Sequence, residues 1–161
     1  YPPLTPEGGE YSAPDPVMTR PEIYTAELAP EMSEKEGLQR MLRQALGGAD
    51  AAFADTTRLL LKTMESYPLE LAENIILLHV HSGDVVAPTV IVGRTGRDWH
   101  FRNLNGAYRV LLVLLTPRTM TPEQHLKILA DLAHTLLDQQ LVQKIRTADS
   151  AETAARLLFP E

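Results

Sequence analysis

The stretch DWHFRNLNGAYRVLLVLLTP, residues 98–117, decides the fold class of this chain. It carries a turn signal at Asn105 and Gly106. It ends in an apolar run, residues 110–115, that is typical of a strand covered on both faces. The segment HLKILADLAHTLLD, residues 125–138, follows with leucines at helical spacing. A buried strand that leads into an amphipathic helix is typical of an α/β domain.

Upstream segments extend this sheet. Residues 75–80 and 89–92 have the same apolar, β-favouring character, and they predict two more buried strands. The alternating segment 23–28 predicts a short strand that ends before Pro30. The sequence therefore predicts a mixed sheet of four or five strands.

Helix signals lie before and after these strands. A Ser33–Glu36 capping box predicts the first helix, and a second helix is predicted to begin near Asp50. Later helices are predicted to be capped by Thr121 with Gln124, by Asp138, and by Asp149 with Glu152. The helix after Thr121 is expected to bury an apolar stripe of Leu126, Leu129, Leu132, Ala133, Leu136 and Leu137. This order predicts helices on both faces of the sheet.

Composition excludes several classes of function. The chain has 161 residues, no cysteine and a formal charge of -6, and its Lys and Arg residues are scattered. Disulfides and cysteine-ligated metal are therefore absent, and no basic footprint for nucleic acid is visible. The apolar runs are shorter than the roughly 20 residues that cross a bilayer. We expect a cytoplasmic location and no nucleic-acid partner.

Two regions are predicted. Residues 1–22 carry six prolines and two glycines without strand or helix periodicity, which favours a linker. Residues 23–161 are predicted to form one α/β domain. Because the chain begins with Tyr1, we interpret it as a soluble fragment of a longer protein.

Residues 98–117 and 125–138 together resemble the enzyme IIA domains, fructose and mannitol type (type 2), of the bacterial sugar phosphotransferase system. In that family a turn leads into an apolar strand ending in proline, and a helix opening with HLK follows. The segment TADSAETAARLL, residues 147–158, resembles the close of the family. The resemblance implies a IIA type 2-like fold for residues 23–161.

The family motif T-G-[IV]-G-x-G-[IV]-A-[IL]-P-H ends in the histidine that accepts a phosphoryl group. Here LAENIILLHVHSGD, residues 71–84, occupies the matching place, and the resemblance puts His81 at the acceptor position. Val80 replaces the proline, and bulky residues 75–77 replace glycines. Such side chains are expected to deny a phosphoryl group close backbone approach and hydrogen-bond donors.

Two more residues are candidates for binding. His79 and His81 are two apart on a predicted strand, so their side chains point the same way. This suits two imidazoles around one phosphate, a weak metal pair, or a half-polar strand end. With Asp84 they could bind a nucleotide or another anion. For His125, in the first turn of a helix, we expect a neutral hydrogen-bonding role. We expect no metal and no cofactor.

The altered motif favours a non-catalytic regulatory or interaction domain, carried on the cytoplasmic side of a bacterial membrane transporter. Its partners would be the membrane-spanning region of the parent protein and, in a homodimer, a second copy. The alternative is an active phosphocarrier. In that case any enzymatic activity would be phosphoryl transfer through a phosphohistidine at His81, from the histidine phosphocarrier protein to a IIB partner.

Overall fold

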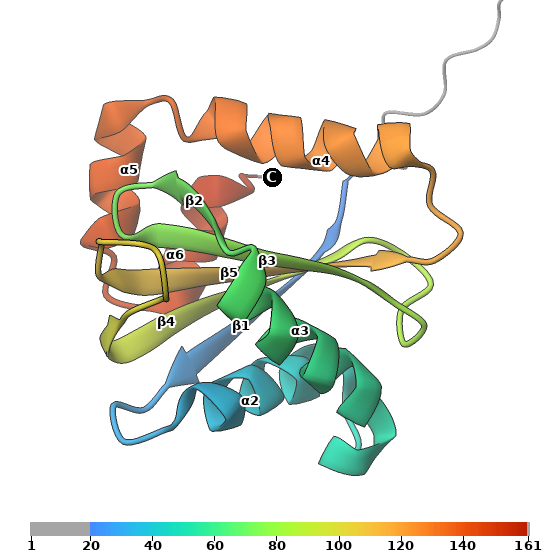
Figure 1. Cartoon of the computed structure of the whole chain (residues 1–161). Coiled ribbons are helices and arrows are strands. Elements are labelled where there is room, and N and C mark those ends of the chain that lie inside the picture. Colours follow the sequence, from blue (N-terminus) through green and yellow to red (C-terminus); the bar gives the residue numbers. More distant parts are fainter. Residues whose placement is uncertain (1–19, 161) are drawn as a thin grey trace, which may run out of the picture.

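A five-stranded mixed sheet lies between two layers of helices (Figure 1). The computed structural model describes residues 20–160. The predicted linker, residues 1–22, therefore falls almost entirely outside the described residues. Within residues 20–160, no helix combines the length and the apolar character that a membrane span requires.

The elements follow one another in this order: β1 (Glu22–Leu28), α2 (Glu34–Leu46), a 3₁₀ turn (Asp50–Phe53), α3 (Ala54–Ser66), β2 (Leu69–Ala72), β3 (Ile75–Ser82), β4 (Thr89–Trp99), β5 (Tyr108–Pro117), α4 (Pro122–Thr135), α5 (Gln139–Arg146) and α6 (Ala151–Leu158).

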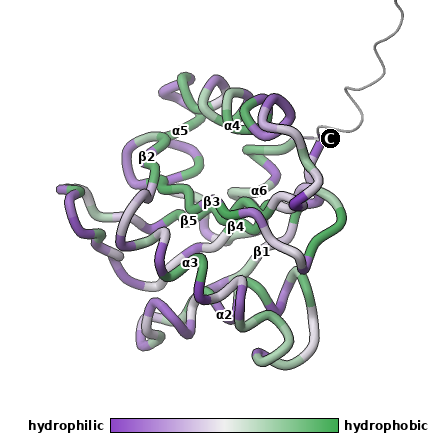
Figure 2. Tube along the Cα trace, turned by 45° about the vertical axis from the view of Figure 1, so that its right-hand side comes forward, coloured by the Kyte–Doolittle hydropathy of each residue, from purple (hydrophilic) through white to green (hydrophobic). Residues whose placement is uncertain are grey.

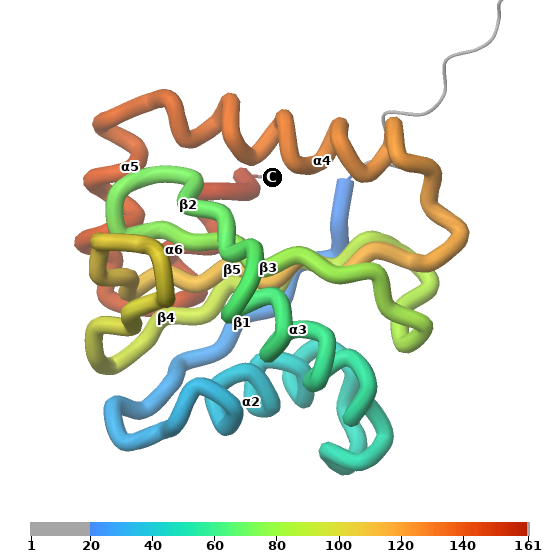
Figure 3. Tube along the Cα trace, in the orientation of Figure 1, coloured from blue at the N-terminus to red at the C-terminus, as the bar shows by residue number. Residues whose placement is uncertain are grey.

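The strand order is β1-β4-β5-β3-β2. β1 pairs with β4 and β3 pairs with β5 in parallel, whereas β4–β5 and β2–β3 are antiparallel. β1 thus lies beside a strand that follows it by more than 60 residues (Figure 3). The predicted mixed α/β sheet is confirmed, with β2 as its fifth strand.

Alternate residues of the central strands enter two separate cores. In β3, Ile76 and Leu78 pack with α2 and α3, while Ile75 and Leu77 pack with α4, α5 and α6. This two-sided burial explains the continuous apolar runs, because neither face of the strand meets water. Figure 2 accordingly shows much of the central sheet as hydrophobic, with hydrophilic colour on loops and outer helix turns.

The capping boxes are confirmed at two helix starts. Ser33 Oγ accepts the Glu36 amide at 3.1 Å, and Thr121 Oγ1 accepts the Gln124 amide at 3.2 Å. Asp138 caps α5 as expected. The predicted cap of α6 at Asp149 is wrong, because Ser150 Oγ accepts the Thr153 amide instead.

The structure differs from the prediction in the burial of α4 and in one additional strand. The predicted buried stripe of α4 is wrong at Leu126, Ala133 and Leu137, which are exposed, and Ile128 is buried instead. The short edge strand β2 was not among the predicted strands. In the β4–β5 connection, which contains the predicted turn signal at Asn105 and Gly106, Asn103 has left-handed backbone, at φ 70°.

Gly96 on β4 marks a close backbone approach. A Cβ atom there would lie 2.6 Å from Cδ and 2.8 Å from N of Pro30, which follows β1. We predict that Gly96→Ala lowers the free energy of unfolding by about 1–3 kcal/mol, because backbone must move to relieve the overlap. Urea unfolding monitored by circular dichroism measures this change.

Gly83→Ala is the matched control, since its Cβ would meet only the end of the Arg118 side chain, at 3.2 Å. Equal stabilities of the two variants would contradict the predicted overlap at Gly96.

Candidate functional site

Three histidines meet where β3 ends beneath α4. The ring centroids of His79 and His125 are 3.7 Å apart, and His81 lies 5.3 Å from His79 and 5.2 Å from His125. One ring nitrogen from each residue lies within 4.8 Å of the other two. Residues separated by more than forty positions in sequence thus form one polar cluster, which we call the histidine cluster.

Local sequence accounts for the position of each ring. His79 and His81 follow Ile75 and Leu77 at period two, so they share the sheet face that α4 covers. The Thr121 capping box fixes the start of α4. The His125 amide donates to the Thr121 carbonyl, so its side chain belongs to the first helical turn, over the end of β3.

Thr116 links the two histidines of β3. It is the register partner of His81 on β5 and is fully buried. Its Oγ1 lies 3.1 Å from His79 Nε2 and 2.9 Å from His81 Nδ1. The hydroxyl has one proton and two lone pairs, so it can donate to at most one ring and must accept an N–H from at least one of them. Thr116 therefore couples the protonation states of the two imidazoles.

The cluster favours neutral imidazoles in its interior. Burial, followed by the nearby His125 and His81, lowers the pKa of His79 to about 4. Burial and His81 also lower the pKa of His125. His81 is exposed, whereas the other two rings are half-buried. The expectation of a neutral His125 agrees with this lowered pKa, and the cluster presents one solvent-reachable ring supported by two neutral ones.

Asp84 lies in a different network. Thr56 on α3 donates to Asp84 Oδ2 at 2.6 Å and also lies 2.7 Å from the buried Ser82 Oγ. Since Thr56 has one hydroxyl proton, Ser82 donates to Thr56, and the Asp84 amide in turn donates to Ser82. The structure therefore brings His79 and His81 together as expected, while Asp84 is held by the helix on the opposite face.

The bulky residues ahead of His81 do not cover it. Ile75, Ile76 and Leu77 lie in the two cores with at most 1% exposure. β2 pairs with β3 only at these three positions, so the outer edge beside His79 and His81 has no strand partner within residues 20–160.

The pattern of hydrogen bonds places main-chain donors on this edge. The Val110 amide donates to the Asn74 carbonyl, and Val110 is the register partner of Ile75. Alternate residues of a strand direct their amides to opposite edges of that strand. In the parallel pairing of β3 with β5, the amides of Ile76 and Leu78 therefore donate to β5. The amides of His79 and His81 accordingly face the outer edge.

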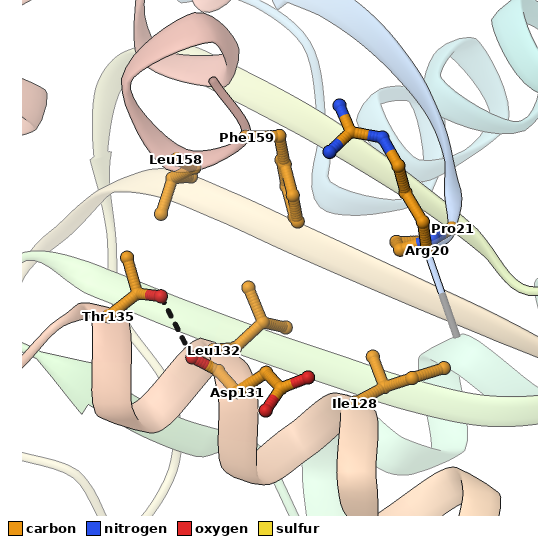
Figure 4. Close-up of a pocket in the computed structure, with 8 residues that line it drawn as sticks. All are labelled: Arg20, Pro21, Ile128, Asp131, Leu132, Thr135, Leu158 and Phe159. Atoms are coloured by element: carbon orange, nitrogen blue, oxygen red, sulfur yellow. Dashed lines mark hydrogen bonds between the residues drawn. The ribbon is translucent and has the colours of Figure 1, made fainter. Parts of the chain in front are cut away.

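A separate cavity of about 210 Å³ lies between α4 and the end of α6 (Figure 4). Apolar side chains such as Ile128, Leu158 and Phe159 line it, together with the oppositely charged Arg20 and Asp131. None of the three clustered histidines lines this cavity, and we take the histidine cluster as the candidate functional site.

The family model described as phosphoenolpyruvate-dependent sugar phosphotransferase system, EIIA 2, matches residues 27–159. The chain belongs to this family. The resemblance inferred from residues 98–117 and 125–138 is thereby confirmed, and this chain is a IIA-type domain.

Solved IIA structures have the same fold. Nitrogen regulatory protein IIA-Ntr from Neisseria meningitidis is 22% identical with a TM-score of 0.65, and the match covers 83% of this chain and 92% of that one. IIA mannitol from Escherichia coli is 15% identical with a TM-score of 0.60, and the match covers 85% of this chain and 95% of that one. A chain of the Escherichia coli complex of enzyme IIAMTL with phosphorylated enzyme IIBMTL is 12% identical with a TM-score of 0.59. This match covers 87% of the present chain and 95% of that one.

His79 makes the stability of this IIA domain depend on pH. Its pKa is about 4 in the folded chain and about 6.5 when unfolded, so between these values the unfolded chain binds a proton that the folded chain does not. The stabilisation is present above the unfolded pKa and is lost as the pH falls toward about 4. We predict that His79→Asn reduces the acid-induced loss of unfolding free energy by about 1–2 kcal/mol, a value discounted for partial solvent screening.

Urea unfolding at about pH 7 and about pH 4.5 measures this difference. His134→Asn, at an exposed position of α4, is expected to lose as much stability as the wild type. If His79→Asn lost as much unfolding free energy on acidification as the wild type, His79 would not be responsible for the pH dependence of stability.

Proposed function

We propose that this IIA domain accepts a phosphoryl group on Nε2 of His81. The observation that carries the proposal is the state of this imidazole: it is exposed, its Nδ1 is 2.9 Å from Thr116 Oγ1, and within residues 20–160 no hydrogen bond engages its Nε2. A reachable ring nitrogen with its partner nitrogen held in place is what nucleophilic catalysis by histidine needs.

The proposed chemistry uses the Nδ1–H form of His81. Nδ1–H donates to Thr116 Oγ1, so Nε2 carries the lone pair. That lone pair forms a bond to phosphorus as the bond between phosphorus and the donor's histidine nitrogen breaks, and the electrons of that bond stay on the donor nitrogen. Thr116 then hydrogen-bonds the positive ring and stabilises it.

Several features support a bound phosphoryl group at this position. The amides of His79 and His81 face an edge without a strand partner, where they can donate to phosphoryl oxygens. His125 lies in the first turn of α4, where the helix dipole favours a nearby anion. Since the aliphatic residues 75–77 lie in the cores, their replacement of the family's glycines does not shield His81.

The proposed partners follow from the family. The histidine phosphocarrier protein would supply the phosphoryl group, and a IIB protein would receive it. The mannitol IIA domain of Escherichia coli, which has the same fold, is known in complex with phosphorylated IIB.

A second candidate is a non-catalytic regulatory domain on the cytoplasmic side of a bacterial membrane transporter, interacting with the parent protein or with a second copy. The observation that favours it is the neutral interior of the histidine cluster. The lowered pKa values of His79 and His125 leave these rings without the positive charge that would neutralise a phosphoryl dianion. Val80 in place of the motif's proline is consistent with this candidate.

Incubation with the general phosphotransferase components and labelled phosphoenolpyruvate separates the two candidates. We predict acid-labile label on the wild type and on His134→Asn. We predict at least about 100-fold less label on His81→Asn, because the nucleophile is lost. Circular dichroism and urea unfolding establish that the variants are folded.

An unlabelled wild type would contradict the phosphocarrier function and favour the regulatory one. Equal label on His81→Asn would show that a different histidine accepts the phosphoryl group.

A further inference from the structure

We propose that His79, His81 and His125 bind one divalent transition-metal ion, with Zn²⁺ as the best-suited ion. The sequence suggested at most a weak pair at His79 and His81. The structure adds a third imidazole from α4, and one ring nitrogen from each residue lies within 4.8 Å of the other two. Three histidines around an open coordination position constitute a recognised ligand set for zinc.

The geometry is close to that of a bound ion. Zinc–nitrogen bonds of about 2.0–2.1 Å in a tetrahedron require ligand nitrogens about 3.3 Å apart. The largest separations in the histidine cluster must therefore shorten by about 1.5 Å. Small changes in the side-chain torsions of the three histidines, none of which belongs to a hydrophobic core, supply such a movement.

The donor set selects the class of ion. Imidazole nitrogens suit zinc, copper and nickel, whereas calcium and magnesium require oxygen ligands. Asp84, the nearest candidate carboxylate in sequence, is bound to Thr56 instead.

Thr116 provides the outer support that metal-binding histidines commonly have. Its Oγ1 contacts His79 Nε2 and His81 Nδ1, and its two lone pairs can accept an N–H from each ring. Both rings would then direct their remaining nitrogens, His79 Nδ1 and His81 Nε2, to the ion. Three protein ligands leave a fourth position for water or a small anion.

The metal site shares His81 with the proposed phosphoryl acceptor. A metal ion and a phosphoryl group would use the same lone pair on Nε2, so the two states exclude one another. Zinc is therefore expected to inhibit phosphorylation of His81, and this consequence rests on the proposed function. Metal binding itself does not, because it can be measured without any phosphotransferase component.

The test uses the whole chain without a histidine tag, stripped of metal by chelation. Titration with Zn²⁺ is followed by calorimetry, and titration with Co²⁺ by its visible absorption, which reports tetrahedral coordination. We expect one saturable equivalent of metal. We expect His79→Asn, His81→Asn and His125→Asn each to weaken binding by at least about 100-fold, and Thr116→Val by about 10-fold.

His134→Asn, on α4 but outside the cluster, is the matched control and is expected to bind like the wild type. Circular dichroism checks that each variant is folded. Absence of a saturable equivalent in the wild type would overturn the proposal. Unchanged binding by His125→Asn would also overturn it, because the ion would then lie on a two-histidine surface rather than in the cluster.

Discussion

The parallel pairing of β3 with β5 is the constraint on which the site depends. This register sets His81 opposite Thr116 and leaves His79 within hydrogen-bonding distance of the same hydroxyl. If the pairing register of β3 shifted by one residue, every β3 side chain would change to the other face of the sheet. Both imidazoles would then point toward α3, and each aliphatic residue before them would enter the opposite core. The burial of both faces of β3 therefore fixes the geometry of the histidine cluster, although none of the three histidines belongs to a hydrophobic core.

The functional character of the site comes from its place at the end of a buried strand. Along β3 the side chains change from fully buried aliphatic residues to half-buried His79 and exposed His81 within eight residues. Burial keeps the inner rings neutral, while solvent reaches the outer one. We therefore propose that the same cluster offers either a nucleophilic nitrogen to a phosphoryl donor or three lone pairs to a metal ion.

Local sequence patterns predicted most of the fold, but they did not predict that His125 and Thr116 belong to the site. Buried strands and capping boxes are readable because each depends on a few neighbouring residues. In contrast, β2 is only four residues long, and its side chains are exposed or half-buried. The spacing of two residues correctly predicted that the side chains of His79 and His81 point to the same face of the sheet. His125 and Thr116 join them only through helix packing and strand register, which adjacent residues do not encode. Asp84, which we grouped with them because it is close in sequence, belongs to the network on the other face.

We propose that Thr116 holds His81 with a proton on Nδ1 and a free lone pair on Nε2. Nitrogen-15 NMR of the metal-free chain at neutral pH measures this directly, because the two ring nitrogens of each tautomer have distinct chemical shifts. We predict the Nδ1–H tautomer for His81, and a mixture of tautomers when Thr116 is replaced by valine. A His81 ring protonated on Nε2 in the wild type would contradict it.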